Sequence, residues 1–88
     1  MELKPVTSKM FAEVGFDPTA QRLHIRFHPK KGEAQGAVYE YGDDKTPFTP
    51  THWEALRTAE SKGGHFSRHV RSHFPFRVVE AGTAATVN

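Results

Sequence analysis

The sequence contains no cysteine and only one tryptophan in 88 residues. Without cysteine the chain cannot form a disulfide framework, a thiolate zinc site or a cysteine nucleophile. No apolar run approaches the roughly 18 residues that a membrane-spanning helix needs. Residues 1–5 also lack the apolar stretch of a signal peptide. We therefore expect a cytoplasmic protein with no membrane partner.

Recognisable motifs of catalysis and cofactor binding are missing as well. No phosphate-binding loop, dinucleotide fingerprint or calcium loop occurs, and no nucleophile, base and orienting group stand at a known spacing. His65, His69 and His73 follow one another at four-residue intervals. Two such imidazoles can share a metal ion, but a polar flank of a helix is the simpler interpretation. We expect no enzyme activity, no metal and no cofactor.

Length and charge limit the remaining possibilities. A chain of 88 residues allows a single domain with one modest core. The formal net charge is only +2, less than an obligate nucleic-acid-binding protein usually carries. The excess is concentrated near the C-terminus, where Lys62, Arg68, Arg71 and Arg77 are opposed by Glu80 alone. This segment is either a solvated helix face or a docking face for phosphate or for an acidic protein.

Three segments show the alternation of apolar and polar residues that is typical of strands, namely residues 10–16, 22–28 and 37–42. In the second segment Leu23, Ile25 and Phe27 share one face and polar residues share the other, which favours an antiparallel sheet with one wet face. In the first segment the alternation predicts that Met10, Ala12, Val14 and Phe16 share a face. Residues 29–36 form a polar loop between the second and third segments.

Two helices follow the strands. The first begins either at Thr49, with Pro50 at its first position, or at Thr51, with Glu54 completing a capping box. We expect Gly63-Gly64 to end it and a second helix to cover residues 65–73. The predicted fold is therefore α+β: an antiparallel three-stranded meander packed against two short C-terminal helices, with residues 76–79 available for a short last strand. Residues 1–80 form the domain and residues 81–88 a flexible tail.

Five spaced pieces of the chain then point to a known family. They are residues 7–18, which open with Thr7-Ser8; Leu23-His24-Ile25-Arg26-Phe27; Tyr39-Glu40-Tyr41; residues 59–66, which contain Gly63-Gly64; and Phe74-Pro75-Phe76. Together they resemble the KTSC domain, which is named after a C-terminal domain of some lysyl-tRNA synthetases and also occurs as a small stand-alone bacterial or phage-type protein. The loop at 28–36 is longer than usual in that family, and Ser67 replaces an asparagine.

The resemblance implies RNA binding, and the residues allow two further functions. For RNA, Tyr39 and Tyr41 share a strand face and could stack on bases, although a pair of core tyrosines explains the pattern equally well. Phosphates would be held by Lys62, Arg68, Arg71, Lys30 and Lys31. The alternatives are a protein-interaction module, such as an adaptor or inhibitor, and an oligomer formed through an edge strand. Exposure of both tyrosine rings on the cationic face would favour RNA, whereas buried tyrosine rings, or an exposed apolar patch such as Phe11, Phe48 or Phe76, would favour a protein partner.

Overall fold

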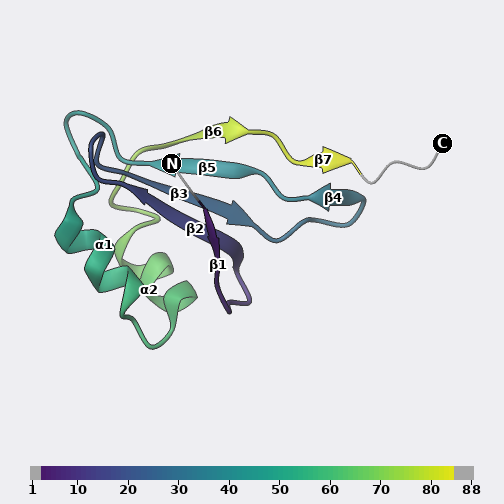
Figure 1. Ribbon diagram of the computed structural model, residues 1–88, viewed down its shortest axis with the longest axis horizontal. Helices are drawn as coiled ribbons and strands as arrows, with labels where there is room; N and C mark the ends of the chain where they lie inside the picture. The colour runs from purple at the N-terminus through teal and green to yellow at the C-terminus, as the bar shows by residue number, and fades with distance from the viewer. Residues whose placement is uncertain (1–2, 85–88) are drawn as a thin grey trace.

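The computed structural model describes residues 3–84, which form an α+β domain (Figure 1). The strands are β1 Lys4–Pro5, β2 Phe11–Asp17, β3 Arg22–Phe27, β4 Glu33–Gln35, β5 Val38–Tyr41, β6 Phe76–Glu80 and β7 Thr83–Ala84. The helices are α1 Pro50–Arg57 and α2 Lys62–His69. Antiparallel pairing joins five strands into one sheet in the order β1-β2-β3-β5-β6, and β4 pairs separately with β7.

The predicted three-stranded meander is therefore the centre of a larger sheet. Strand β1 has two residues, one of them Pro5, and is too short to show an alternation. The expected last strand is present as β6 and extends the sheet beside β5. The two helices consequently lie between β5 and β6 in the chain, not at its C-terminal end as predicted. We call the sheet face that packs against them the front face, and the opposite face the back face.

Strand β3 follows the predicted alternation, with Leu23 and Ile25 fully buried. Strand β2 does not, because its register with β3 shifts between Phe11 and Glu13. Such a bulge places an extra residue in one strand and reverses the alternation beyond it. Phe11, which the simple alternation placed opposite Val14, is 0% exposed and joins Val14 in the core.

Both helices begin with a side-chain cap. Thr49 caps α1 and exchanges hydrogen bonds with His52, which settles the two predicted starts in favour of Thr49. Ser61 caps α2 and accepts from the Gly64 backbone N–H at 3.2 Å. Gly63-Gly64 therefore lies in the first turn of α2, and the helix is shifted three to four residues from the predicted 65–73. Within residues 3–84, neither helix is long and apolar enough to cross a membrane.

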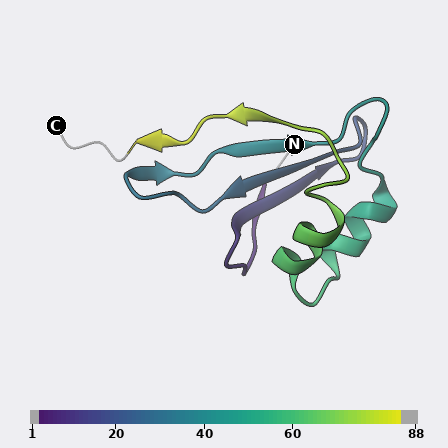
Figure 2. The same ribbon diagram turned by 180° about the vertical axis from the view of Figure 1, so that it is seen from behind.

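The core lies between the front face and the helices. Leu56 of α1 and Phe66 of α2 are buried against it, together with Val70 and Phe74 from the turn after α2. Phe48, before α1, is also 0% exposed. Seen from either side, the helices pack at one end of the sheet and the β4–β7 ribbon projects from the other (Figure 2).

That ribbon is formed by two segments for which the sequence indicated a loop and a tail. Residues 29–36 contain β4, and its partner β7 lies within the predicted tail, whose residues 85–88 fall outside the described part of the chain. Gly36 makes the return from β4 possible, since a Cβ there would collide with the Phe27 carbonyl group. The long loop is thus held close to the end of β3.

Candidate binding groove

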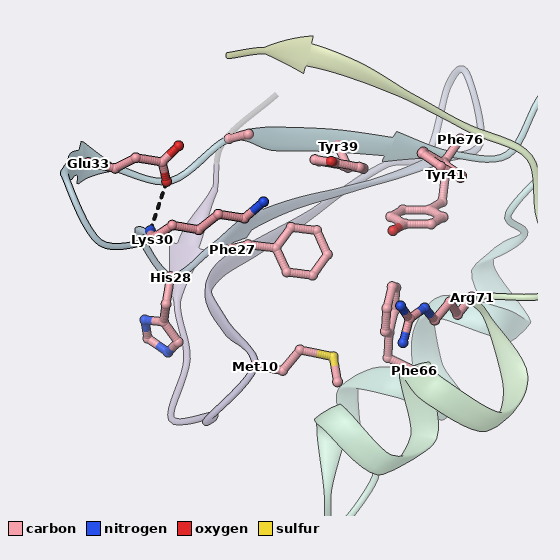
Figure 3. Close-up of a pocket in the computed structure, with 11 residues that line it drawn as sticks. Met10, Phe27, His28, Lys30, Glu33, Tyr39, Tyr41, Phe66, Arg71 and Phe76 are labelled. Atoms are coloured by element: carbon pink, nitrogen blue, oxygen red, sulfur yellow. Dashed lines mark hydrogen bonds between the residues drawn. The ribbon is translucent and has the colours of Figure 1, made fainter. Parts of the chain in front are cut away.

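The front face is only partly covered, because each helix has eight residues and so spans about 12 Å. The helices do not cover the front face beyond Phe66. A cavity of about 520 Å³ lies there, between α2, the ends of β3 and β5, and β6. We call this cavity the aromatic groove (Figure 3). It is lined by Met10, Phe27, His28, Lys30, Glu33, Ala37, Tyr39, Tyr41, Phe66, Arg71 and Phe76.

Aromatic rings form the walls of the groove. Tyr41 meets Phe66 edge to face with ring centroids 5.1 Å apart, and Phe27 meets Tyr39 in the same way at 5.2 Å. Phe76 lies nearly parallel to Tyr39, with centroids 5.5 Å apart. Edge-to-face and offset parallel arrangements are those that aromatic pairs favour. The walls of the groove are therefore formed by aromatic rings that pack on one another.

The rings differ in how far water reaches them. Tyr41 is 4% exposed, Tyr39 is half-buried, and Phe76 is 59% exposed. Burial raises the pKa of Tyr41 to about 12, with a smaller rise from Tyr39 and an opposing effect of the nearby Arg71 guanidinium. Phe76 therefore presents the most accessible aromatic surface of the groove. The two tyrosine rings are thus not both exposed, and the exposed ring is that of Phe76, which the sequence criterion assigned to a protein partner; Phe11 and Phe48 are buried.

Positive charge flanks the aromatic walls. Arg71, just after α2, lies at one end of the groove, and Lys30 reaches from the β3–β4 loop toward Phe27 at the other (Figure 3). Both side chains belong to exposed residues, and within residues 3–84 neither forms an ion pair with an acidic side chain. Glu33 is the one carboxylate in the lining, and it accepts from the backbone N–H of Lys30 at 2.8 Å.

Four of the seven residues that sequence analysis proposed for ligand binding thus meet in one place: Tyr39, Tyr41, Lys30 and Arg71. The other three do not line the groove. Lys31 is exposed on the neighbouring loop. Lys62 lines a separate hollow with Ser8 and Gly63, and Arg68 turns back on α2 to donate from Nε to the Gly64 carbonyl oxygen at 3.2 Å.

Sequence reasoning missed the phenylalanines and Met10 of the groove. In the sequence, the phenylalanines of the groove cannot be told apart from core phenylalanines: Phe27, Phe66 and Phe76. They line a groove because the helices are short and because β6 lies at the edge of the sheet. The histidine series is also interrupted, because α2 ends at His69 and leaves His73 in the following turn. Among the described residues, no three histidine, aspartate or glutamate side chains approach closely enough to hold a metal ion.

The fold and the groove define a small α+β domain with one partly covered aromatic sheet face. The family model of the KTSC domain matches residues 7–74, so the chain belongs to the KTSC family. A crystal structure of a KTSC domain protein from Yersinia pestis is similar to it at 26% sequence identity, with a TM-score of 0.71, covering 89% of this chain and 96% of that one. No curated protein matches the sequence.

Proposed function

We propose that this protein is a non-catalytic binding module that holds single-stranded RNA in the aromatic groove. The observation that carries the proposal is the combination of an accessible aromatic ring, Phe76, with two cations that form no ion pair among residues 3–84, Arg71 and Lys30. Proteins that bind single strands combine aromatic side chains for base stacking with positive charge along the backbone path. The groove offers both within one cavity.

The proposal gives each group of the groove a role. A base stacks on Phe76, the most exposed ring of the groove, which itself lies nearly parallel to Tyr39 with ring centroids 5.5 Å apart. Arg71 and Lys30 lie toward opposite ends of the groove, so they can contact successive phosphates on either side of that base. His28, Lys30 and Glu33 lie together at one end and supply groups that can hydrogen-bond a ribose hydroxyl, the feature that distinguishes RNA from DNA.

Fluorescence anisotropy with a labelled single-stranded RNA of about 10 nucleotides, and with the DNA of the same sequence, tests the proposal. We expect micromolar binding that weakens between about 50 and about 200 mM salt, because phosphate contacts release counterions. Phe76→Ala should weaken binding by about 5-fold or more through lost stacking. Arg71→Ala should weaken binding and reduce the salt dependence.

Arg68→Ala is the matched control, because it removes the same charge three residues away, within α2, at a side chain that does not line the groove. An equal loss with Arg68→Ala and Arg71→Ala would place the RNA elsewhere. Absence of binding at about 50 mM salt would contradict the RNA proposal altogether.

Protein–protein interaction is a second candidate function. It is favoured by the exposed apolar residues of β6, where Phe76, Val78 and Val79 are 59%, 51% and 41% exposed. Exposed apolar groups gathered on one strand are typical of docking surfaces. The geometry of this strand supports a more definite inference about the partner.

A further inference from the structure

Strand β6 is the outer strand of the five-stranded sheet. Within residues 3–84 it pairs with β5 alone, and all five of its residues, Phe76–Glu80, are exposed. Its outward side therefore presents backbone N–H and C=O groups that can pair with another strand. Phe76 and Val78 stand opposite Tyr41 and Tyr39, so both belong to the front face.

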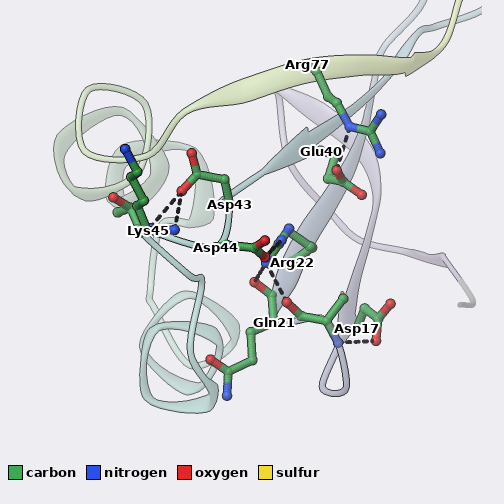
Figure 4. A network of polar contacts seen from close by, with 10 residues as sticks. Asp17, Gln21, Arg22, Glu40, Asp43, Asp44, Lys45 and Arg77 are labelled. Atoms are coloured by element: carbon green, nitrogen blue, oxygen red, sulfur yellow. Dashed lines mark hydrogen bonds and ion pairs between the residues drawn. The ribbon is translucent and has the colours of Figure 1, made fainter.

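Two rows of polar side chains cross the back face and end at β6. In the first row Glu40 accepts from Arg77 Nε at 2.7 Å (Figure 4). Glu40 also contacts His24 Nε2 at 2.9 Å. In the second row Arg26 pairs with Glu13 and with Glu80, each at 2.8 Å. The residue of the first row at the sheet edge is therefore a cation, Arg77, and the residue of the second row at that edge is a carboxylate, Glu80.

A bulge in β6 places these two edge charges on the same face. Tyr39 pairs with Val78 and Val38 pairs with Glu80, so Val79 is an extra residue in β6. Residues three apart in a regular strand point to opposite faces, but the extra residue brings both Arg77 and Glu80 to the back face. The segment Arg77-Val78-Val79-Glu80 therefore reads cation, apolar, apolar, carboxylate, and it is complementary to itself when reversed.

We propose that β6 is an interface for a second copy of this chain, paired antiparallel about a two-fold axis between Val78 and Val79. In that register Arg77 lies opposite Glu80 of the partner subunit, and this contact occurs twice. Val78 lies opposite Val79 of the partner subunit, which covers the exposed side chains of these two valines. Interfaces of a symmetric dimer have this self-complementary form, and opposite charges facing one another across strands stabilise the pair.

Both edge charges have room for the second contact. The Arg77 side chain is 71% exposed and the Glu80 side chain is 53% exposed. Arg77 uses Nε for Glu40, which leaves its two terminal nitrogens, and Glu80 uses one carboxylate oxygen for Arg26. The dimer therefore adds ion pairs to the existing rows without breaking them. A single strand pair buries less than the roughly 1,200 Å² of a standard stable interface, so association should depend on concentration.

Sedimentation velocity of the RNA-free protein over a range from about 10 μM to about 1 mM tests this inference. We expect the wild type to shift from monomer to dimer over this range. Arg77→Glu and Glu80→Arg should each stay monomeric, because each places like charges opposite one another at both symmetric positions. Lys9→Glu changes charge in the loop before β2, away from β6, and should dimerise like the wild type.

A mixture of the two charge-reversal variants provides the decisive measurement. In a mixed dimer the reversed carboxylate at position 77 meets the reversed cation at position 80, and the native Arg77–Glu80 contact forms at the other end. An equimolar mixture should therefore dimerise although neither variant does alone. Far-UV circular dichroism of each variant confirms that it is folded despite the lost ion pair with Glu40 or Arg26.

Three results would overturn the inference: a wild type that remains monomeric at about 1 mM, a dimer that persists in both single variants, or folded variants whose mixture stays monomeric. The first result would make a different protein the candidate partner of β6. The RNA titration with Phe76→Ala and Arg71→Ala can succeed or fail separately, since dimerisation is measured without RNA.

Discussion

Tyr41 and Phe76 stand directly opposite each other in the β5–β6 pair, with ring centroids 5.6 Å apart. One of them is 4% exposed and the other 59%. The difference arises from their neighbours, because Phe66 of α2 packs edge to face on Tyr41 whereas β6 lies at the edge of the sheet. Of these two adjacent rings on the front face, Tyr41 therefore belongs to the core and Phe76 to the accessible surface.

The first prediction compares the stability cost of removing a core ring with that of removing an accessible ring. Phe66→Ala removes a ring that contacts Phe11, Phe27 and Tyr41, and it should lower the free energy of unfolding by about 3–5 kcal/mol. Phe76→Ala should cost about 1 kcal/mol or less, since the ring is mostly in water. Urea denaturation followed by circular dichroism measures both. Equal losses would contradict the assignment of Phe76 to an accessible surface.

The second prediction concerns the Tyr41 hydroxyl. Its pKa is raised by burial from 10.0 to about 12, so the folded state favours the neutral phenol. This contribution to stability is complete below pH 10 and is lost as the pH rises from 10 toward 12. Absorbance titration near 295 nm should show a late ionisation that Tyr41→Phe removes. A wild-type titration without a late step would contradict the burial of Tyr41.

The third prediction concerns Glu40 on the back face. Burial opposes ionisation of this carboxyl, but hydrogen bonds from Arg77 and His24 outweigh it and lower the pKa below the ordinary 4.5. The contribution of Glu40 to stability is therefore present above pH 4.5 and is lost as the pH falls through the lowered pKa. Glu40→Gln should be less stable than the wild type at pH 7, and the difference should shrink in acid. Urea denaturation at several pH values measures this difference, and a constant difference would contradict the prediction.

The fourth prediction concerns Gly36, where the chain returns from β4 toward β5. A Cβ would collide with backbone atoms of Phe27, which cannot move without disturbing β3. Gly36→Ala should lower the free energy of unfolding by about 2 kcal/mol or more. Ala34→Ser, at an exposed position of the neighbouring β4, should change it by less than about 0.5 kcal/mol. Thermal or urea denaturation compares the two variants, and similar stability for both would show that the loop can adjust.

The sequence predicted the central strands and both helices because their signals are local. The alternation of Leu23 and Ile25 reports directly on burial, and Thr49-Pro50 marks a helix start through its own chemistry. One wrong prediction concerns a feature that depends on contacts between residues far apart in the sequence. The bulge in β2 changes which face Phe11 occupies, and it depends on pairing with β3. The start of α2 was also predicted wrongly although its signal is local, because Ser61 caps the helix and places Gly63-Gly64 in its first turn, where the sequence indicated a break.

The candidate site was predicted in part for the same reason. Two-residue spacing places Tyr39 and Tyr41 on one face in any strand, so their common location follows from the sequence. Which of the basic residues line the groove does not follow from the sequence, because it depends on where α2 begins. With α2 at Lys62–His69, Arg71 follows the helix and lies at the groove, while Arg68 turns back onto the helix.

Trp53 is the single tryptophan of the chain, and it stacks on Phe16 with ring centroids 5.6 Å apart at an interplanar angle of 10°. It lies in a different hollow from the aromatic groove, beside Val14 and Leu56. Its intrinsic fluorescence will therefore follow the opening of the contact between α1 and the sheet, and it will be a poor reporter of occupancy at Phe76 or of pairing at β6. Loss of the native emission during a titration would signal unfolding, which gives each binding experiment an internal check on the integrity of the domain.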